Sequence, residues 1–206
     1  MKVALLGGTG GFGTALAVRL REAGYDVVIG SRDAERAQAA AAELGVEGAT
    51  NEDAAQAAAL VVIATKAEGA VETASSLSEA IGSTPVLSVA AELTFGKGGV
   101  SPTTEATSIA RRIQDVVEGP VIAGLHSLAA SNLGGAEAPD EDTLVCGDDL
   151  EAKDLVLELA GKLTSGRAID AGPLSSARAL EGMTAVIVNV NKRYKAHAGL
   201  RITGLH

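Results

Sequence analysis

Five glycines lie within seven residues near the start of the sequence and define the first candidate site. Gly8, Thr9, Gly10, Gly11, Phe12 and Gly13 fit the pattern G-x-G-x-x-G directly after an apolar segment. In this pattern the first glycine permits a tight turn, the second lets backbone approach a pyrophosphate, and the third lets helix and strand pack closely. The dipole and free amides of the following helix also favour an anion. The loop therefore predicts dinucleotide binding rather than a purely structural turn.

The second candidate strand indicates which dinucleotide binds. It continues as VVIGSRDAERA, so Gly30 and Ser31 stand where an NAD-binding protein normally has Asp or Glu, and Arg32 follows them. A carboxylate there would repel the additional phosphate of NADP, whereas serine and arginine can bind it. Arg36 lies four residues beyond Arg32, so on a shared helix both guanidinium groups would converge on that phosphate. The alternative is surface pairing of both arginines with neighbouring acids. The pattern favours NADP(H) over NAD(H).

Further candidate contacts follow other strands of the predicted sheet. In an open parallel sheet, ligands bind beyond the carboxyl ends of the strands. The residues expected there are mostly small and would allow a flat nicotinamide ring to approach: Thr65, Ala67, Ala91, His126 and Ala130. His126 could hydrogen-bond a ring substituent or relay a proton, or it could be a buried structural histidine.

No side chains are spaced for nucleophilic catalysis, and no tyrosine is followed four residues later by a lysine. We therefore expect no catalytic residue and no metal. Direct hydride transfer between two redox cofactors needs little acid–base help, because the cofactor rings carry the reactive chemistry.

Alternating strand and helix patterns must position these residues, and they predict an α/β fold. The expected architecture is a doubly wound parallel sheet of the Rossmann type over residues 1–171, followed by a small C-terminal helical cap over residues 172–206. Strands are expected at Lys2–Leu6, Asp26–Ile29, Leu60–Ala64, Pro85–Val89, Val121–Leu125, Thr143–Cys146 and Ala168–Asp170. Helices are expected at Gly13–Glu22, Ala34–Leu44, Asn51–Ala58, Glu68–Ile81, Pro102–Val117, from the cap Asp149 to Leu163, and at Leu174–Tyr194.

Composition narrows the protein class. A net charge of −9 argues against nucleic acid as a partner, and no apolar run is long enough for a membrane helix. Cys146 is the single cysteine, which excludes an internal disulfide, and we expect a cytoplasmic homo-oligomer without a signal peptide. Nine carboxylates between Glu137 and Glu158 accompany only Lys153, a pattern typical of a solvated face.

The C-terminal segment has the opposite charge. Gly182–His206 holds no acidic residue but contains Lys192, Arg193, Lys195 and Arg201. This segregation points to an anionic partner, or else to a favourable helix C-terminus or a subunit contact.

Several segments, in order along nearly the whole chain, carry a resemblance to a known family: MKVALLGGTGGFGTALAVRL, VVIGSR, NEDAA, GLHSLAA, VCGDD, AIDAGPLSSARALE and RITGL. The chain resembles the NADPH-dependent reductases of the 5-deazaflavin coenzyme F420. The resemblance implies reversible hydride transfer between F420 and NADP, with NADP on Thr9–Phe12, Ser31, Arg32 and Arg36 and the two rings face to face under the C-terminal part.

The segments ATKAEGA and VAAEL lack the proline and tryptophan associated with this family near the nicotinamide. Two alternatives therefore stay open. One is an NADPH-dependent reductase of a small imine, ketone or metal complex, and the other is a non-catalytic NADPH sensor.

Overall fold

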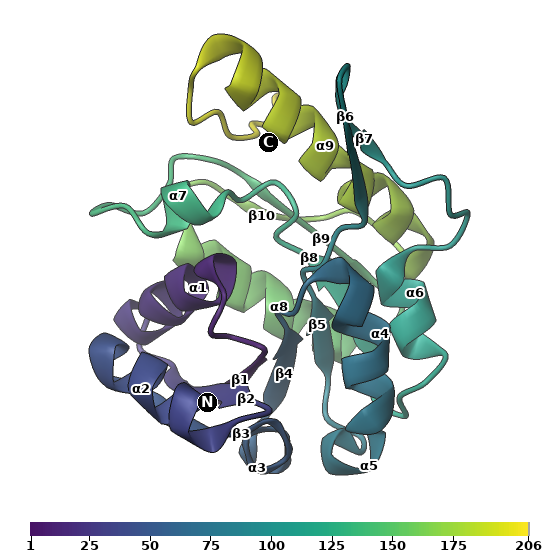
Figure 1. The fold of residues 1–206 in the computed structure, drawn as a ribbon. Coiled ribbons are helices and arrows are strands. Elements are labelled where there is room, and N and C mark those ends of the chain that lie inside the picture. The colour runs from purple at the N-terminus through teal and green to yellow at the C-terminus, as the bar shows by residue number, and fades with distance from the viewer. Residues whose placement is uncertain (206) are drawn as a thin grey trace.

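One eight-stranded sheet organises the protein, whose computed structural model describes residues 1–205 (Figure 1). The strand order is β10-β9-β8-β5-β4-β1-β2-β3, and all neighbours are parallel except β8 and β9. The strands are β1 (Lys2–Leu6), β2 (Asp26–Ser31), β3 (Glu47–Thr50), β4 (Leu60–Ile63), β5 (Val86–Ser88), β8 (Val121–Gly124), β9 (Thr143–Gly147) and β10 (Ala168–Asp170). The strand order reverses between β1 and β4, so a crevice for ligands is expected beyond the carboxyl ends of these two strands.

Helices cover both faces of the sheet, as expected for a mostly parallel sheet whose central strands are buried and largely apolar. Cores form on one face under α3, α4, α5, α6 and the start of α9, and on the other under α1, α7 and α8. The helices are α1 (Gly11–Glu22), α2 (Ala34–Leu44), α3 (Asn51–Ala57), α4 (Ala67–Ser76), α5 (Ser78–Ile81), α6 (Ile109–Gln114), α7 (Ala130–Leu133), α8 (Leu150–Leu163) and α9 (Ala177–Tyr194), with a short 3-10 turn at Leu174–Ser176. The predicted doubly wound Rossmann-type fold is thus confirmed. The proposed boundary between residues 171 and 172 stays a prediction.

The sheet is not parallel throughout, because β9 runs antiparallel to β8 with Ala123 opposite Cys146. The connection between them therefore starts and ends at the same edge of the sheet. As a result residues 125–142, including α7, lie over the carboxyl ends of the central strands. α7 is held to α1, where Arg19 Nε donates to the Leu133 carbonyl at 2.8 Å.

The prediction of a helix from Pro102 to Val117 was wrong in its first half. Leu93–Gly96 (β6) and Gly99–Pro102 (β7) pair as an antiparallel hairpin, and Pro102 is the last residue of β7. The helix begins only at Ile109, where the Ser108 hydroxyl accepts from the Arg111 amide at 3.1 Å. Serine followed by proline also suits the end of an outer strand, since Pro102 has no amide to donate.

Two smaller differences concern β3 and α4. The edge strand β3 is short and contains Glu, Gly and Thr, so it lacks the apolar run on which strand prediction depends. The expected helix Glu68–Ile81 is divided into α4 and α5 at Leu77, whose backbone leaves the helical region.

The acidic segment 137–158 is only partly a solvated face. Asp142 is fully buried and Glu141 is 2% exposed. The Asp142 carboxylate accepts from the Arg167 guanidinium at 2.9 Å and from the Ile202 amide at 2.8 Å, and these bonds hold its pKa well below the usual range. Arg201 pairs with Asp140 and lies 3.5 Å from Asp142. We name this set of contacts the Asp142 clamp.

α9 and the β6–β7 hairpin lie side by side beyond the carboxyl ends of the strands (Figure 1). α9 starts buried against α6, where the Glu181 carboxylate accepts from the Ile109 and Ala110 amides at 3.0 and 3.1 Å. Its second half reaches past the sheet toward the hairpin. Within residues 1–205, every helix is too short or too polar to span a bilayer.

Candidate functional site

The glycine loop joins β1 to α1 as the sequence predicts. Gly7 has φ +72°, and its amide donates to the Gly30 carbonyl at 3.2 Å, which fixes the turn against β2. A Cβ on Gly13 would lie 2.7 Å from Gly8 Cα, so Gly8 and Gly13 allow strand and helix to pack closely.

Gly10 and Gly11 require a different explanation. In the part of the chain described, no atom lies within 4 Å of a Cβ built on either residue. Gly10 is also the N-cap of α1, and no side chain among residues 1–205 caps this helix with a hydrogen bond. Since protein packing does not explain these glycines, an open cradle with free amides remains, and this suits an anionic group.

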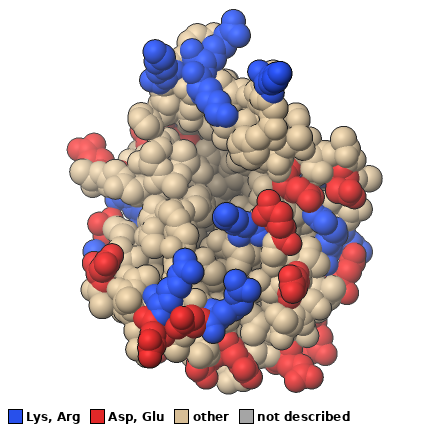
Figure 2. Space-filling model, viewed as in Figure 1, with Lys and Arg blue, Asp and Glu red and all other residues tan. Residues whose placement is uncertain are grey.

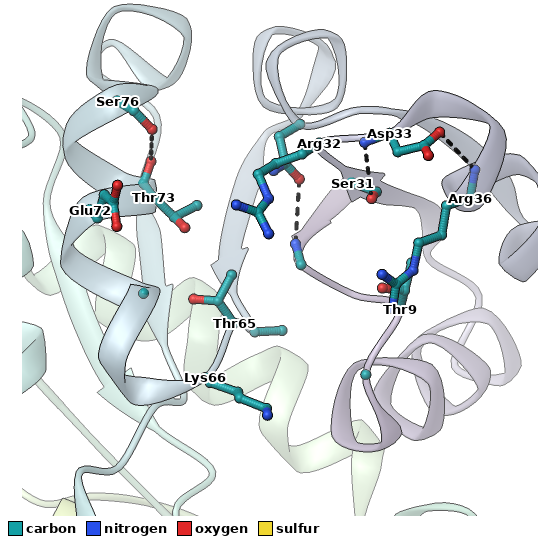
Figure 3. Close-up of a pocket in the computed structure, with 15 residues that line it drawn as sticks. Thr9, Ser31, Arg32, Asp33, Arg36, Thr65, Lys66, Glu72, Thr73 and Ser76 are labelled. Atoms are coloured by element: carbon teal, nitrogen blue, oxygen red, sulfur yellow. Dashed lines mark hydrogen bonds between the residues drawn. The ribbon is translucent and has the colours of Figure 1, made fainter.

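A cavity of about 510 Å³ lies beyond the ends of β1, β2 and β4, and we call it the phosphate cavity. Gly7, Thr9, Gly10, Ser31, Arg32, Asp33, Arg36, Asn51, Ala64, Thr65, Lys66, Gly69, Glu72, Thr73 and Ser76 line it (Figure 3). Neither Arg32 nor Arg36 forms an ion pair with an acid among residues 1–205, which contradicts the alternative of surface pairing.

Asp33 is an acid that lies between the two arginines in sequence, but its carboxylate does not neutralise them, because it caps a helix instead. It is the N-cap of α2, and its Oδ1 accepts from the Glu35 and Arg36 amides at 3.0 and 3.2 Å. The Ser31 hydroxyl in turn accepts from the Asp33 amide at 3.2 Å.

The two guanidinium groups do not converge as predicted. Figure 3 shows Arg32 reaching over the cavity toward α4, whereas Arg36 points toward Thr9. The reason is that Arg32 precedes the extended N-cap Asp33 and so does not share a helical face with Arg36. The two cations flank Ser31 instead.

A second cavity, of about 620 Å³, adjoins the first, and we call it the ring cavity. Ala64, Thr65 and Lys66 line both cavities and connect them. The other residues that line the ring cavity are Phe12, Ala67, Glu68, Val89, Ala90, Ala91, Glu92, Leu93, Thr94, Phe95, Thr103, Leu125, His126, Leu128 and Thr184. The structure thus brings together the predicted contacts Phe12, Thr65, Ala67, Ala91 and His126. Ala130 starts α7 and lines neither cavity.

His126 is buried at the end of β8, where burial lowers its pKa to about 4. Its Nε2 lies 3.2 Å from the Ala90 carbonyl, which can only accept, so Nε2 carries the proton. Nδ1 is then an acceptor, and no described residue bonds it. Leu125, directly before it, has φ +66°, a strained value for a residue with a side chain.

Sequence reasoning missed several residues that line the cavities. Asn51 accepts from the Gly7 amide at 3.4 Å, and Thr184 donates to the His126 carbonyl at 2.9 Å. Thr73 and Ser76 reach the phosphate cavity from α4. Their positions depend on long-range packing, and no local motif marks them. Lys66 could have been predicted to line the site, because it lies between the predicted contacts Thr65 and Ala67.

Comparison with known proteins gives one consistent result. Residues 2–92 match the family described as NADP oxidoreductase coenzyme F420-dependent. The chain is 37% identical to the F420-dependent NADP reductase of Methanothermobacter marburgensis, covering 100% of this chain and 99% of the relative. It is 35% identical to the protein of that name from Methanothermobacter thermautotrophicus, over 100% of this chain and 96% of the relative.

A solved structure agrees with these sequence relatives. A candidate F420-dependent NADP-reductase from Arthrobacter sp. FB24 has a TM-score of 0.87 and 27% identity, covering 99% of this chain and 100% of that one. The sequence identity to these relatives extends over the full length of the chain, and the glycine cradle and the joined cavities agree with it. The chain therefore belongs to the F420-dependent NADP reductase family.

Proposed function

We propose that this protein transfers a hydride reversibly between NADP(H) and coenzyme F420. The observation that carries the proposal is the junction of two unlike cavities at Ala64–Lys66. One holds a glycine cradle and the arginines Arg32 and Arg36, which have no acidic partners among residues 1–205. The other is walled largely by small and apolar residues and can accept flat rings.

Residues of the phosphate cavity would bind and select the dinucleotide. The amides at Gly10 and Gly11 suit the pyrophosphate, while Ser31, Arg32 and Arg36 suit the additional phosphate of NADP. Binding on these groups would direct the nicotinamide toward Thr65, where the two cavities meet.

Residues of the ring cavity would orient the rings and exclude water. Ala67 and Ala91 leave space beside the rings, and Thr65 Oγ1 is a buried polar atom without a described partner. The His126 Nδ1 acceptor suits an N–H donor on a ring substituent. The two cofactors supply the redox chemistry themselves, so no side chain has to transfer a proton.

A purified sample tests the proposal directly. NADPH should bleach oxidised F420, and NADP should reoxidise the reduced coenzyme. Turnover of a small imine or ketone without F420 turnover would favour the first alternative, and NADPH binding without any turnover would favour the sensor. The cytoplasmic location and homo-oligomeric state also stay predictions, and sedimentation tests the latter.

A further inference from the structure

A buried acid on α9 joins this helix to α6. The two carboxylate oxygens of Glu181 each accept one hydrogen bond, from the Ile109 amide at 3.0 Å and from the Ala110 amide at 3.1 Å. The Ser108 hydroxyl accepts from the next amide, that of Arg111, at 3.1 Å. The first three amides of α6 therefore all have an acceptor, and α9 supplies the acceptor for two of them.

Stability alone does not explain a charge at this position. Burial raises the pKa of Glu181, because the charged form loses its hydration, while the two amides and the nearby Arg112 and Arg178 favour the charged form. A buried charge is weak evidence for stability, since a well-packed apolar residue often serves as well, and its best-attested use is to fix the register between two elements. Glu181 thus fixes the position of α9 relative to α6.

Two further polar side chains of α9 make long-range contacts. Thr184 follows Glu181 by three residues and so lies on the same face of the helix, and its hydroxyl donates to the His126 carbonyl at 2.9 Å. Asn189 Oδ1 accepts from the Val100 amide at 2.8 Å, and its Nδ2 donates to the Val100 carbonyl at 2.6 Å. Along its length α9 therefore contacts α6, the loop after β8 and the β6–β7 hairpin.

The contact made by Thr184 lies at the ring cavity. Thr184 and His126 both line this cavity, and the His126 ring bonds the Ala90 carbonyl. The positive φ of Leu125 is strained, so the loop after β8 depends on surrounding contacts to keep its conformation. Figure 2 shows a hollow below the lobe that α9 and the hairpin form. A shift of α9 would move Thr184 and change the wall against which the rings pack.

We propose that Glu181 is a positioning residue for hydride transfer, which fixes α9 on α6 and so holds Thr184 against the His126 carbonyl. This inference rests on the proposed function and adds to it a residue outside both cavities. Glu181 lines neither the phosphate cavity nor the ring cavity, so it acts only through Thr184. Such a residue matters because a small misplacement of reacting groups, caused far from the chemistry, can cost much of the rate.

The first test replaces Glu181 by an amide of the same shape. In Glu181→Gln one carboxylate oxygen becomes an N–H donor that faces a backbone amide, which is also a donor, so this contact is lost. We expect the KM for F420 to rise about fivefold, as for the loss of one ordinary hydrogen bond, and the KM for NADPH to stay the same. The thermal midpoint should fall.

Ser108→Ala is the matched control, because it uncaps the same helix without changing the contact with α9. Its thermal midpoint should also fall, since loss of an N-cap destabilises a helix, but both KM values should equal those of the unaltered protein. A raised F420 KM in both variants, or in neither, would overturn the positioning role and make Glu181 a helix cap only.

A second pair of variants tests whether the effect passes through Thr184. Thr184→Val removes the hydroxyl, keeps the shape and should itself raise the KM for F420. Adding Glu181→Gln to Thr184→Val should raise this KM no further, because both changes break the same connection. Effects that multiply would show that Glu181 acts by another route and would contradict the proposal.

Glu181→Asp provides a test that does not depend on the folding of Glu181→Gln. It keeps both carboxylate oxygens but is one methylene shorter, so it can cap α6 only if α9 moves. The KM for F420 should rise while the thermal midpoint stays close to that of the unaltered protein, and an unchanged KM would overturn the proposal. Failure of the proposed function gives a different result, because the unaltered protein would then not bleach F420 with NADPH.

Discussion

The phosphate cavity and the ring cavity adjoin each other, but they differ in how far apart in sequence their lining residues lie. The phosphate cavity is made by residues 7–76, and its principal groups lie in two short turns after β1 and β2. The ring cavity is closed by the hairpin at residues 93–102, by the loop after β8 and by Thr184 on α9, which are distant in sequence. The first site therefore depends on local motifs, whereas the second depends on tertiary contacts such as Asn189 with Val100. The two should respond separately to substitution.

The strongest expected effect comes from Gly10→Val. The new side chain would occupy the open cradle and block the amides, so we expect NADPH affinity to fall at least about 100-fold, or about 2.7 kcal/mol. Because no described atom lies near the added Cβ, the thermal midpoint should hardly move. Gly161→Val, on an exposed position of α8, is the matched control. Full NADPH affinity in folded Gly10→Val would show that the cradle does not bind the pyrophosphate.

His126, which lines the ring cavity, should make the free energy of unfolding depend on pH. The pKa of His126 is about 4 in the folded protein and near 6.5 when unfolded. Between these values the unfolded chain binds the additional proton, so the free energy of unfolding should rise with pH, by about 3 kcal/mol in total. His126→Asn should remove this part of the rise, measured by denaturant unfolding from pH 4 to 7. His197→Asn, at an exposed histidine, serves as control, and identical profiles for all three proteins would contradict the prediction.

Arg32→Ala should affect the phosphate cavity alone. Loss of a charge-assisted hydrogen bond should weaken NADPH by about 1.5–3 kcal/mol and leave NADH almost unchanged. Binding titrations with both dinucleotides measure the difference. Arg111→Ala removes an exposed arginine elsewhere and controls for charge. If both dinucleotides weakened equally, Arg32 would not be a phosphate contact.

Asn189→Ala should give the smallest effect and should affect only the ring side. Two lost hydrogen bonds predict a decrease of about 1–2 kcal/mol in the free energy of unfolding. The KM for F420 should rise as the hairpin loosens, while the KM for NADPH should stay the same. A rise in both KM values would mean that the two cavities are not independent.

The difference between local motifs and tertiary contacts also decides which features could be predicted from the sequence. The glycine loop, Ser31 and the seven anticipated strands depend on local patterns, and the structure contains them. The hairpin at residues 93–102 and the reversed β9 were missed, because strand direction and pairing depend on partners elsewhere in the chain. The convergence of Arg32 with Arg36 failed for a local reason, since Arg32 lies before the cap Asp33 and outside the helix Ala34–Leu44, so helical spacing does not apply to the pair.

The Asp142 clamp has a consequence for the order in which the protein matures during synthesis. Asp142 is the last residue of the loop over the ring cavity, directly before β9, and its carboxylate is satisfied by Arg167 and by the Ile202 amide. A nascent chain that ends before residue 202 would leave this buried charge without its full set of partners. The loop that carries His126 is therefore secured only after residues 200–202 have emerged from the ribosome.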